Sequence, residues 1–525
     1  MKRKTLIIIL SGVITFIIMI ILFTKFFIEP WVENKIRAVL KDKISKYMVD
    51  IEKIHVSIFT LGLELKNISV NTNQEHRSDA DLNASIESIS IKGIDPWKII
   101  FKNDITINKI TISNINGVIP VSDDSIQPVI STLNIRIDEI FFEKINLKIK
   151  NKKSTQSYTI NEGALYVYDW QVLKKESLSS KNIKQIGFKS KEFHIVTADS
   201  MYLFSANDLI YSSTTNNLTI NNILIHPNYK GYDFTSRHKY QTDCIEAEFK
   251  NIYINEFPAI KYLQSGSLIC SYVEIGDLEV NVFRDNRKDF LHKNKTQFQD
   301  LIYNYPGSVN IDSIGVINGN VTYTEHDEKA NHPGRISFNK INAKIYTLTN
   351  DTIFKTDKAY LEFKSNSLLM GKSRLSIQLK SQLYDSQNTF SLNGTLSGME
   401  AKDLNPMLER NAFLYASSGI IDEMNFSFTA NNKKATGKMT MLYHGLDIAV
   451  KNEYTDDTTA IKEKITSFFA NIKILDSNPL SGKMPRVGII NFERNPETFL
   501  FSYCFKSILS GCKSSIAKSS SGKKN

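Results

Sequence analysis

Proline and glycine are scarce in this sequence, with 12 and 23 copies among 525 residues. This scarcity excludes collagen-like and low-complexity architectures. The apolar share of 42% and the charged share of 23% also exclude a disordered chain. Four cysteines with no CxxC pair and no matching histidine spacing provide no zinc motif. At this length the chain could form two to four ordinary domains or one elongated domain.

Motifs for catalysis are absent as well. The sequence contains no GxSxG, HExxH, P-loop or GxGxxG pattern, so we predict no catalytic or cofactor-binding residues and a protein that is not an enzyme. His326 and His332 lie near acidic residues, but the segment between them is typical of a polar hairpin loop, and we predict no metal site. Cys244 and Cys270 could pair in an oxidising compartment, although spacing alone leaves that open.

The net charge of +10 comes from lysines scattered among acidic residues rather than from a basic block. A scattered excess is typical of a solvated surface, and it would also suit anionic lipid head groups. Because the basic residues do not cluster, we predict no nucleic-acid partner.

One hydrophobic run, Thr5–Thr24, has about twenty uncharged residues, which is enough to cross a bilayer as a helix. Basic residues 2–4 precede it, and no small-residue cleavage site follows, so we predict an uncleaved membrane anchor. The downstream flank is basic too, and the charge rule does not fix the orientation. We favour a cytoplasmic N-terminus with the bulk of the chain outside.

After the anchor, Ile28–Met48 has apolar residues at helical spacing and is predicted to be an amphipathic helix that plugs the end of the next region. Alternation with period two then dominates, beginning at Ile54. Such alternation predicts antiparallel sheets with one apolar and one wet face. Asp95–Phe101 is predicted to be a short helical turn, with Pro96 at a tolerated early position.

A step of two residues between apolar positions recurs inside these strands. Because the step reverses the pleat, each one requires a bulge or bend to keep the apolar set on one side. In three cases we also expect a turn and a second strand to follow. The repetition favours an elongated array over a compact sandwich. The four steps are Ile107/Ile110, Ile137/Ile140, Ile275/Leu278 and Ile311/Ile314.

The second half shows cleaner strands, around 375–379, 390–396, 424–428 and 439–450, with short helices near 404–408 and 461–472. A last helix, Pro496–Ser510, has more apolar residues than a narrow core stripe requires. It could cap the final strand or dock on a membrane or partner. We favour docking, because Lys506, Lys513 and Lys518 would suit anionic head groups.

Several segments resemble the AsmA-like and TamB-like proteins of the bacterial envelope. They are the basic N-terminus with its anchor and amphipathic helix, the strand unit 54–70, the strand pair within 309–350, and the stretch 392–406. The resemblance implies a diderm bacterium, an inner-membrane anchor and a sheet that curls into an apolar β-groove. It also implies a role in phospholipid transport or outer-membrane homeostasis.

We therefore predict a mainly β protein with one transmembrane helix, an elongated, curled antiparallel sheet and short amphipathic helices. The expected regions are 1–27 (cytoplasmic tip and anchor), 28–50 (amphipathic helix), 51–300 and 301–495 (two β-groove regions) and 496–525 (C-terminal helix and polar tail). The expected localisation is the inner membrane, with most of the chain in the periplasm. The expected partners are phospholipid acyl chains and an envelope or outer-membrane protein at the C-terminus. The predicted groove lining is Leu375, Ile377, Leu379, Phe426 and Phe428.

Two alternatives remain open from the sequence. The apolar strand faces could pack against each other as closed cores. The protein could also be a structural or assembly factor that acts on outer-membrane proteins by strand addition.

Overall fold

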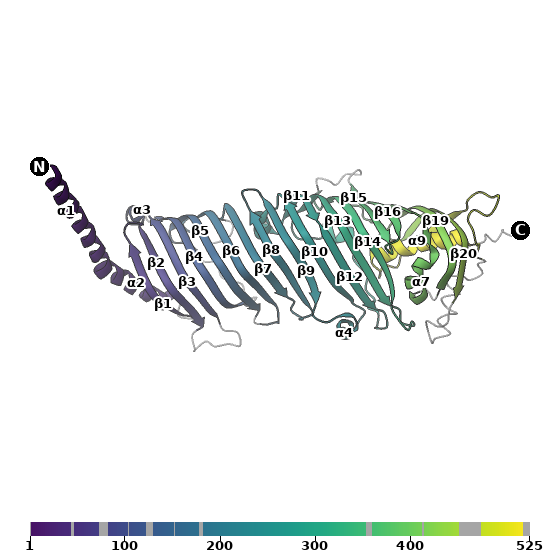
Figure 1. Cartoon of the computed structure of the whole chain (residues 1–525), viewed down its shortest axis with the longest axis horizontal. Coiled ribbons are helices and arrows are strands. Elements are labelled where there is room, and N and C mark those ends of the chain that lie inside the picture. The colour runs from purple at the N-terminus through teal and green to yellow at the C-terminus, as the bar shows by residue number, and fades with distance from the viewer. Residues whose placement is uncertain are drawn as a thin grey trace. The chain divides into compact units, whose positions relative to one another are not determined.

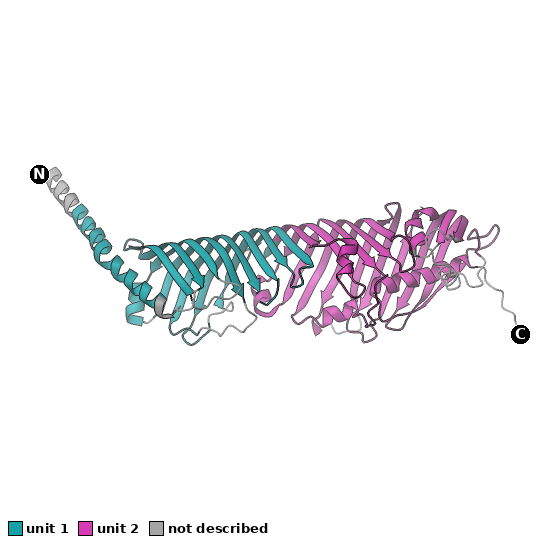
Figure 2. Cartoon of the chain, turned by 90° about the horizontal axis from the view of Figure 1, so that it is seen from below, with its two compact units in different colours: residues 1–218 teal, residues 219–525 magenta. Residues whose placement is uncertain are grey.

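The structure is a computed structural model that describes residues 2–43, 47–72, 82–102, 104–121, 130–151, 153–177, 182–352, 360–411, 414–450 and 474–517. The chain divides into two compact units, Met1–Leu218 and Thr219–Asn525, which Figure 2 colours separately. Among the described residues, strands predominate and helices hold a much smaller share. The prediction of a mainly β protein is confirmed.

The N-terminal helix consists of α1 (Lys2–Phe23), a π-helical turn η1 (Thr24–Ile28) and α2 (Glu29–Lys43). Its part Val13–Leu40 is long and apolar enough to cross a membrane, and only 6% of its most apolar window is buried. This agrees with an anchor. The predicted extension of the amphipathic helix to Met48 is wrong, because Tyr47 and Met48 already pair with Thr72 and Asn71 as strand residues.

The strands of unit 1 form a sheet in chain order (Figure 1). Each pairs with the next in antiparallel fashion except β4 and β5, which are parallel. The short helix α3 (Pro96–Lys102) joins β3 to β4, as predicted. The strands are β1 (Tyr47–Ser57), β2 (Gly62–Thr72), β3 (Asn83–Ile94), β4 (Asp104–Val121), β5 (Asn134–Asn151), β6 (Ser157–Val172), β7 (Gln185–Val196) and β8 (Tyr202–Ser212).

Unit 2 is also built on a sheet, and β9 (Asn217–Pro227) crosses the boundary between the units. Its strands are β10 (Asp243–Asn255), β11 (Leu268–Ile275), β12 (Asp277–Asp285), β13 (Val309–His326), β14 (Gly334–Thr349), β15 (Tyr360–Leu369), β16 (Ser373–Gln382), β17 (Phe390–Leu396), β18 (Met399–Glu400), β19 (Leu414–Ala430), β20 (Lys434–Val450) and β21 (Val487–Glu493). Its helices are α4 (Gly231–Ser236), α5 (Ala259–Ser265), α6 (Phe298–Tyr303), η5 (Ala401–Leu404), α7 (Asn405–Asn411) and α9 (Leu500–Ile516). The helix predicted near 461–472 lies outside the described residues.

The antiparallel prediction holds for most ladders but not for two places. β4 runs parallel to β5, and β11 and β12 run parallel to β13. In both places a longer connection, 122–133 and 286–308, lies between the strands in sequence. Parallel neighbours require such a crossover connection, whereas a short hairpin turn joins antiparallel ones.

Each of the four steps coincides with a break in the pairing, but the register is the same on both sides of the break, so no extra residue is inserted as in a β-bulge. Pairing skips Asn108, Asp138, Gly276 and Asp312, one inside each step. In each case a residue on an adjacent strand has a positive φ: Gly93, Asp169, Asn251 and Thr347. The expected turn and second strand are wrong for β5 and β13, which each continue unbroken through the step. At the step Ile275/Leu278, β11 ends at Ile275 and a second strand, β12, begins at Asp277.

A second row of breaks in the pairing, again without a change of register, crosses unit 1. Pairing skips Glu52, Asn67, Glu87, Asn114 and Lys144 on β1 to β5 in turn. Asn67, Asn114 and Lys144 have φ of 50°, 55° and 53°. The Asn67 and Asn114 amides donate to the carboxylates of Glu52 and Glu87 at 2.6 and 2.9 Å. The sheet is long and uncurled, and the expected curl into a trough is therefore wrong.

Candidate functional site: the apolar face of the sheet

Cross-strand pairing in unit 1 places apolar side chains in continuous columns on one face. Residues directly opposite each other in a ladder share a face. One column runs through Leu65, Ile89, Ile112, Phe142, Leu165 and Phe188. Its neighbour runs through Ile91, Ile110, Ile140, Val167 and Ile186. We call this surface the unit 1 apolar face.

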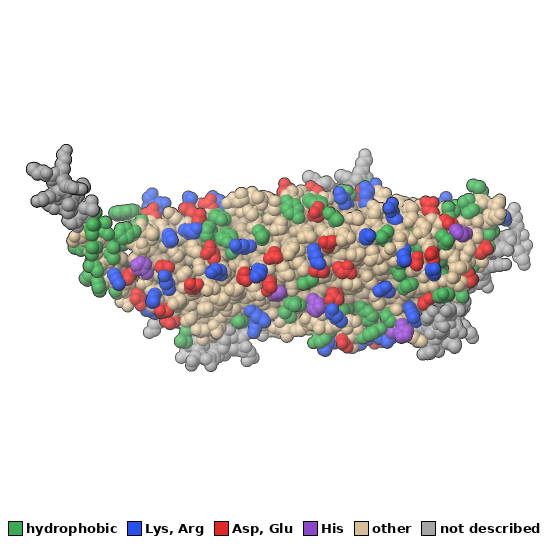
Figure 3. All heavy atoms as spheres, in the orientation of Figure 1, with side chains coloured by type: hydrophobic (Ala, Val, Ile, Leu, Met, Phe, Trp, Pro, Cys, Tyr) green, Lys and Arg blue, Asp and Glu red, His purple; other side chains and the backbone are tan. Residues whose placement is uncertain are grey.

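The opposite face of the same strands is polar. Its columns include Ser88, Ser113 and Glu143, and also Lys92, Lys109 and Glu139. Lys109 and Glu139 form an ion pair at 2.9 Å. Figure 3 shows Lys, Arg, Asp and Glu side chains of both signs interspersed over the face turned to the viewer. The scattered charge predicted from the sequence therefore decorates a solvated sheet face.

Cover of the unit 1 apolar face is uneven among the described residues, because Val167 and Ile186 are only 6% and 5% exposed. Ile112 and Phe142 are half-buried although they lie in the middle of the sheet. The described helices of this unit make appreciable contact only with β1 and β4, at the N-terminal end. A wide row of large aliphatic and aromatic side chains is thus screened mainly by its own neighbours. Such a surface can hold an apolar ligand without further chemistry.

The C-terminal part of unit 2 is different, because a helix closes its apolar face. Tyr503 and Ile516 of α9 join a core with residues of β16 to β21. The predicted lining residues lie in this core: Leu375, Phe426 and Phe428 are 8%, 5% and 2% exposed, and Ile377 and Leu379 pack against it partly buried. In this region the apolar faces form the closed core that we held as an alternative. Lipid contact at these five residues stays a prediction.

Helix α9 also covers the edge of the last strand. The backbone N–H groups of Ile489 and Asn491 on β21 donate to the hydroxyls of Ser514 and Ser510, at 2.9 and 3.2 Å. Gly511 allows the close approach, since a Cβ there would lie 2.7 Å from Cγ1 of Ile490. We favoured docking for this helix, but its contacts are those of a cap. Capping an open edge prevents pairing with another strand.

The cysteines are free thiols. Cys244 pairs with Phe283 near the start of β10, whereas Cys270 lies two residues before Tyr272, the partner of Asn255 at the other end. At about 3.3 Å per residue, that length of β10 is on the order of 35 Å, whereas a disulfide requires Cα atoms within about 7 Å. Their pairing is therefore excluded in this fold. Burial raises the pKa of the Cys504 and Cys512 thiols on α9 to about 12.

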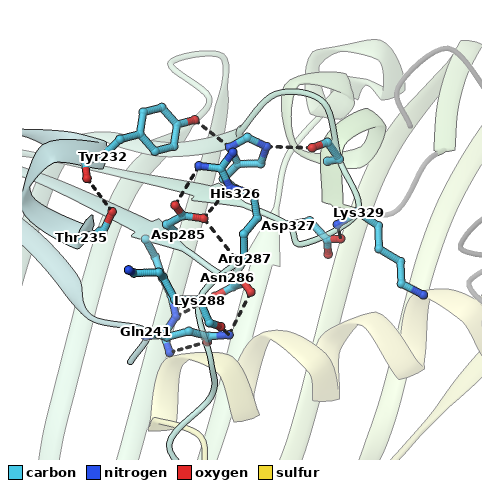
Figure 4. Close-up of polar contacts among 12 residues, drawn as sticks. Tyr232, Thr235, Gln241, Asp285, Asn286, Arg287, Lys288, His326, Asp327 and Lys329 are labelled. Carbon is cyan, nitrogen blue, oxygen red and sulfur yellow. Dashed lines mark hydrogen bonds and ion pairs between the residues drawn. The ribbon is translucent and has the colours of Figure 1, made fainter. Parts of the chain in front are cut away.

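His326 ends β13 and belongs to a polar cluster at the predicted hairpin, drawn in Figure 4. Its Nε2 lies 2.8 Å from the carbonyl of Ala330, and its Nδ1 lies 2.7 Å from the Tyr232 hydroxyl. Beside it, a bidentate hydrogen bond from Arg287 holds the pKa of Asp285 below its ordinary value. These contacts tie α4 and the end of β12 to the hairpin. Among the described residues no group of His, Cys, Asp and Glu could hold a metal ion.

The comparisons with known proteins give no relative for this chain. No protein-family model matches it, and no curated protein matches it.

Sequence reasoning identified the alternating strands but not which part of the apolar face lacks cover. The order of helices and strands along the chain bears on this difference in cover. The described parts of residues 47–212 contain only α3 between strands, whereas the covering helix α9 follows the last strand at the end of the chain. Asn67 and Asn114 could also have indicated where the pairing breaks, because asparagine tolerates positive φ better than most residues.

Proposed function

We propose that this protein is a membrane-anchored lipid carrier whose unit 1 apolar face binds phospholipid acyl chains. The compartment would be the periplasm of a diderm bacterium, with α1 in the inner membrane, in line with the resemblance to AsmA-like proteins. The role would be phospholipid transport in support of outer-membrane homeostasis. One observation carries the proposal: continuous apolar columns cross unit 1 without an appreciable helical cover among the described residues.

A lipid that leaves a bilayer exposes its acyl chains to water, and the free-energy cost of this exposure is large. Exposing one CH₂ group to water costs roughly 0.8 kcal/mol, so a lipid with two chains faces a barrier on the order of 20 kcal/mol. Side chains such as Ile112 and Phe142 would replace that water contact with apolar contact. Binding of this kind is non-directional and tolerates sliding along the columns.

Strand addition is supported less well as an alternative. It needs an open sheet edge, and α9 occupies the edge of β21 with the Ser510 and Ser514 hydroxyls. In unit 1, Glu29 and Arg37 of α2 bond two backbone groups of the edge strand β1.

The test places a small photo-crosslinking amino acid at position 112 on the apolar face, or at position 113 on the polar face. Each full-length protein is expressed in a diderm bacterium, irradiated and analysed by mass spectrometry for attached phospholipid. We expect lipid adducts at 112 and not at 113. A third probe at 428, where Phe428 is 2% exposed, should also give none. Equal labelling at 112 and 113, or none at either, would overturn the proposal.

A further inference from the structure

Four of the most exposed apolar side chains of unit 1 gather where the turn after β1 meets α3. Phe59 in the turn is 71% exposed, and Trp97, Ile100 and Phe101 on α3 are 69%, 68% and 72% exposed. The Trp97 and Phe101 rings stack with centroids 5.7 Å apart. We call these four residues the α3 patch. A soluble protein gains nothing from leaving such a group in water.

Backbone hydrogen bonds fix the turn beside α3. The N–H groups of Gly93 and Ile94 donate to the carbonyls of Thr60 and Leu61, at 3.0 and 2.9 Å. Asp95 then starts α3, since its Oδ1 accepts from the N–H groups of Trp97 and Lys98 at 3.1 Å each. The patch is therefore a built surface of two adjoining segments and not a pair of loose loops.

The same end of unit 1 holds the helix that can span a membrane. Oε1 of Glu29, at the start of α2, accepts from the N–H of Val56 at 3.0 Å, and Val56 lies two residues before the turn. Arg37 adds a second link by donating to the carbonyl of Ile51 at 2.8 Å. Figure 1 shows α1, α2 and α3 at this end of the unit. The α3 patch therefore lies beside the strand β1 that the base of the membrane-spanning helix contacts.

Aromatic residues on that helix indicate the level of the membrane surface. Phe26, Phe27 and Trp31 are 66%, 66% and 63% exposed and follow directly on the apolar run. Tryptophan and other aromatics concentrate at membrane–water interfaces, where one part of the ring is apolar and another is wet. Lysines on α3, Lys98 and Lys102, would meet anionic head groups beside the patch.

We propose that the α3 patch inserts into the interface of the same bilayer that α1 spans, as a second membrane contact. This inference does not depend on acyl-chain binding by the apolar face. If that function also holds, the docking has a consequence for it. Ile94 and Ile107, which pair next to α3, would bring the end of the unit 1 apolar face to the membrane surface, where a lipid can enter.

The experiment uses the full-length protein in liposomes of phosphatidylcholine and phosphatidylglycerol, with or without bromine on the acyl chains. Trp31→Phe and Trp170→Phe leave Trp97 as the single fluorophore. A matched control also carries Trp97→Phe and Ile210→Trp, which moves the fluorophore to a side chain of β8 that is 54% exposed. We expect bromine to lower the Trp97 emission roughly twofold or more, as for an indole at head-group depth, and to leave position 210 unquenched.

A second variant keeps Trp97 and adds Ile100→Glu with Phe101→Glu. Both side chains are exposed, so folding should be unaffected, and protease resistance checks this. We expect the quenching of Trp97 to be lost. Unquenched Trp97 with water-like emission in the parent protein would overturn the proposal, and it is the result that a patch built for a protein partner would give. Lipid crosslinking at position 112 is a separate readout, so failure of one proposal is distinguishable from failure of the other.

Discussion

Unit 1 and the C-terminal part of unit 2 use the same alternating strands in two different ways. In unit 2, α9 lies on the apolar face, and residues such as Phe428 and Met439 are 2% and 1% exposed. In unit 1, Ile112 and Phe142 stay half-buried with no described helix packed along them, although Val167 and Ile186 of the same face are 6% and 5% exposed. The comparison shows that an apolar strand face becomes a core only where another element covers it, and otherwise remains available for a ligand.

Removing the cover should have the largest effect. A chain that ends after Asn495 lacks α9, so Met439, Ile490 and the edge of β21 lose their partner. We expect unit 2 to lose on the order of 5 kcal/mol or more of stability, seen as a much lower melting temperature in detergent and rapid proteolysis. A chain that ends after Ala517 is the control and should melt like the full-length protein. A truncated protein of unchanged stability would show that α9 does not close the core.

The same substitution in the two regions should differ in cost. Phe428→Ala empties a buried site and should lower stability by about 3–5 kcal/mol. Phe142→Ala removes a half-buried ring and should cost only about 1–2 kcal/mol. Thermal unfolding of both purified variants measures the difference. Equal costs would mean that the unit 1 apolar face is as well covered as the core, and this would remove the main support for lipid binding.

Substitutions at the positive-φ residues where the pairing breaks should change stability least. Asn114 has φ of 55°, a region that β-branched residues avoid, so Asn114→Val should lower stability by about 1–2 kcal/mol. Asn114→Gly, which accepts this φ, is the control and should stay within about 0.5 kcal/mol of the parent protein. Limited proteolysis and melting curves check both. If Asn114→Val left the stability unchanged, the backbone at this position would be able to leave the positive-φ region.

Much of the fold could be predicted because it rests on local patterns. The period of two in residues such as Leu375, Ile377 and Leu379 predicted strands, and the step at Ile107 and Ile110 predicted an irregularity, which is present as a break in the pairing. The prediction failed where the answer depends on how distant segments meet. Cys244 and Cys270 looked free to pair, but the register of β10 separates them. The same limit applied to Leu375 and Phe426, because alternation does not reveal what covers a face.

The sequence by itself determined the apolar helix at the N-terminus and the dominance of strands, since both follow from side-chain period and length. Only the tertiary structure decided the parallel pairing of β4 with β5, the capping of β21 by α9 and the difference in cover between the two units. These features depend on packing between segments far apart in the chain, and a residue's own neighbours in sequence carry no record of that packing.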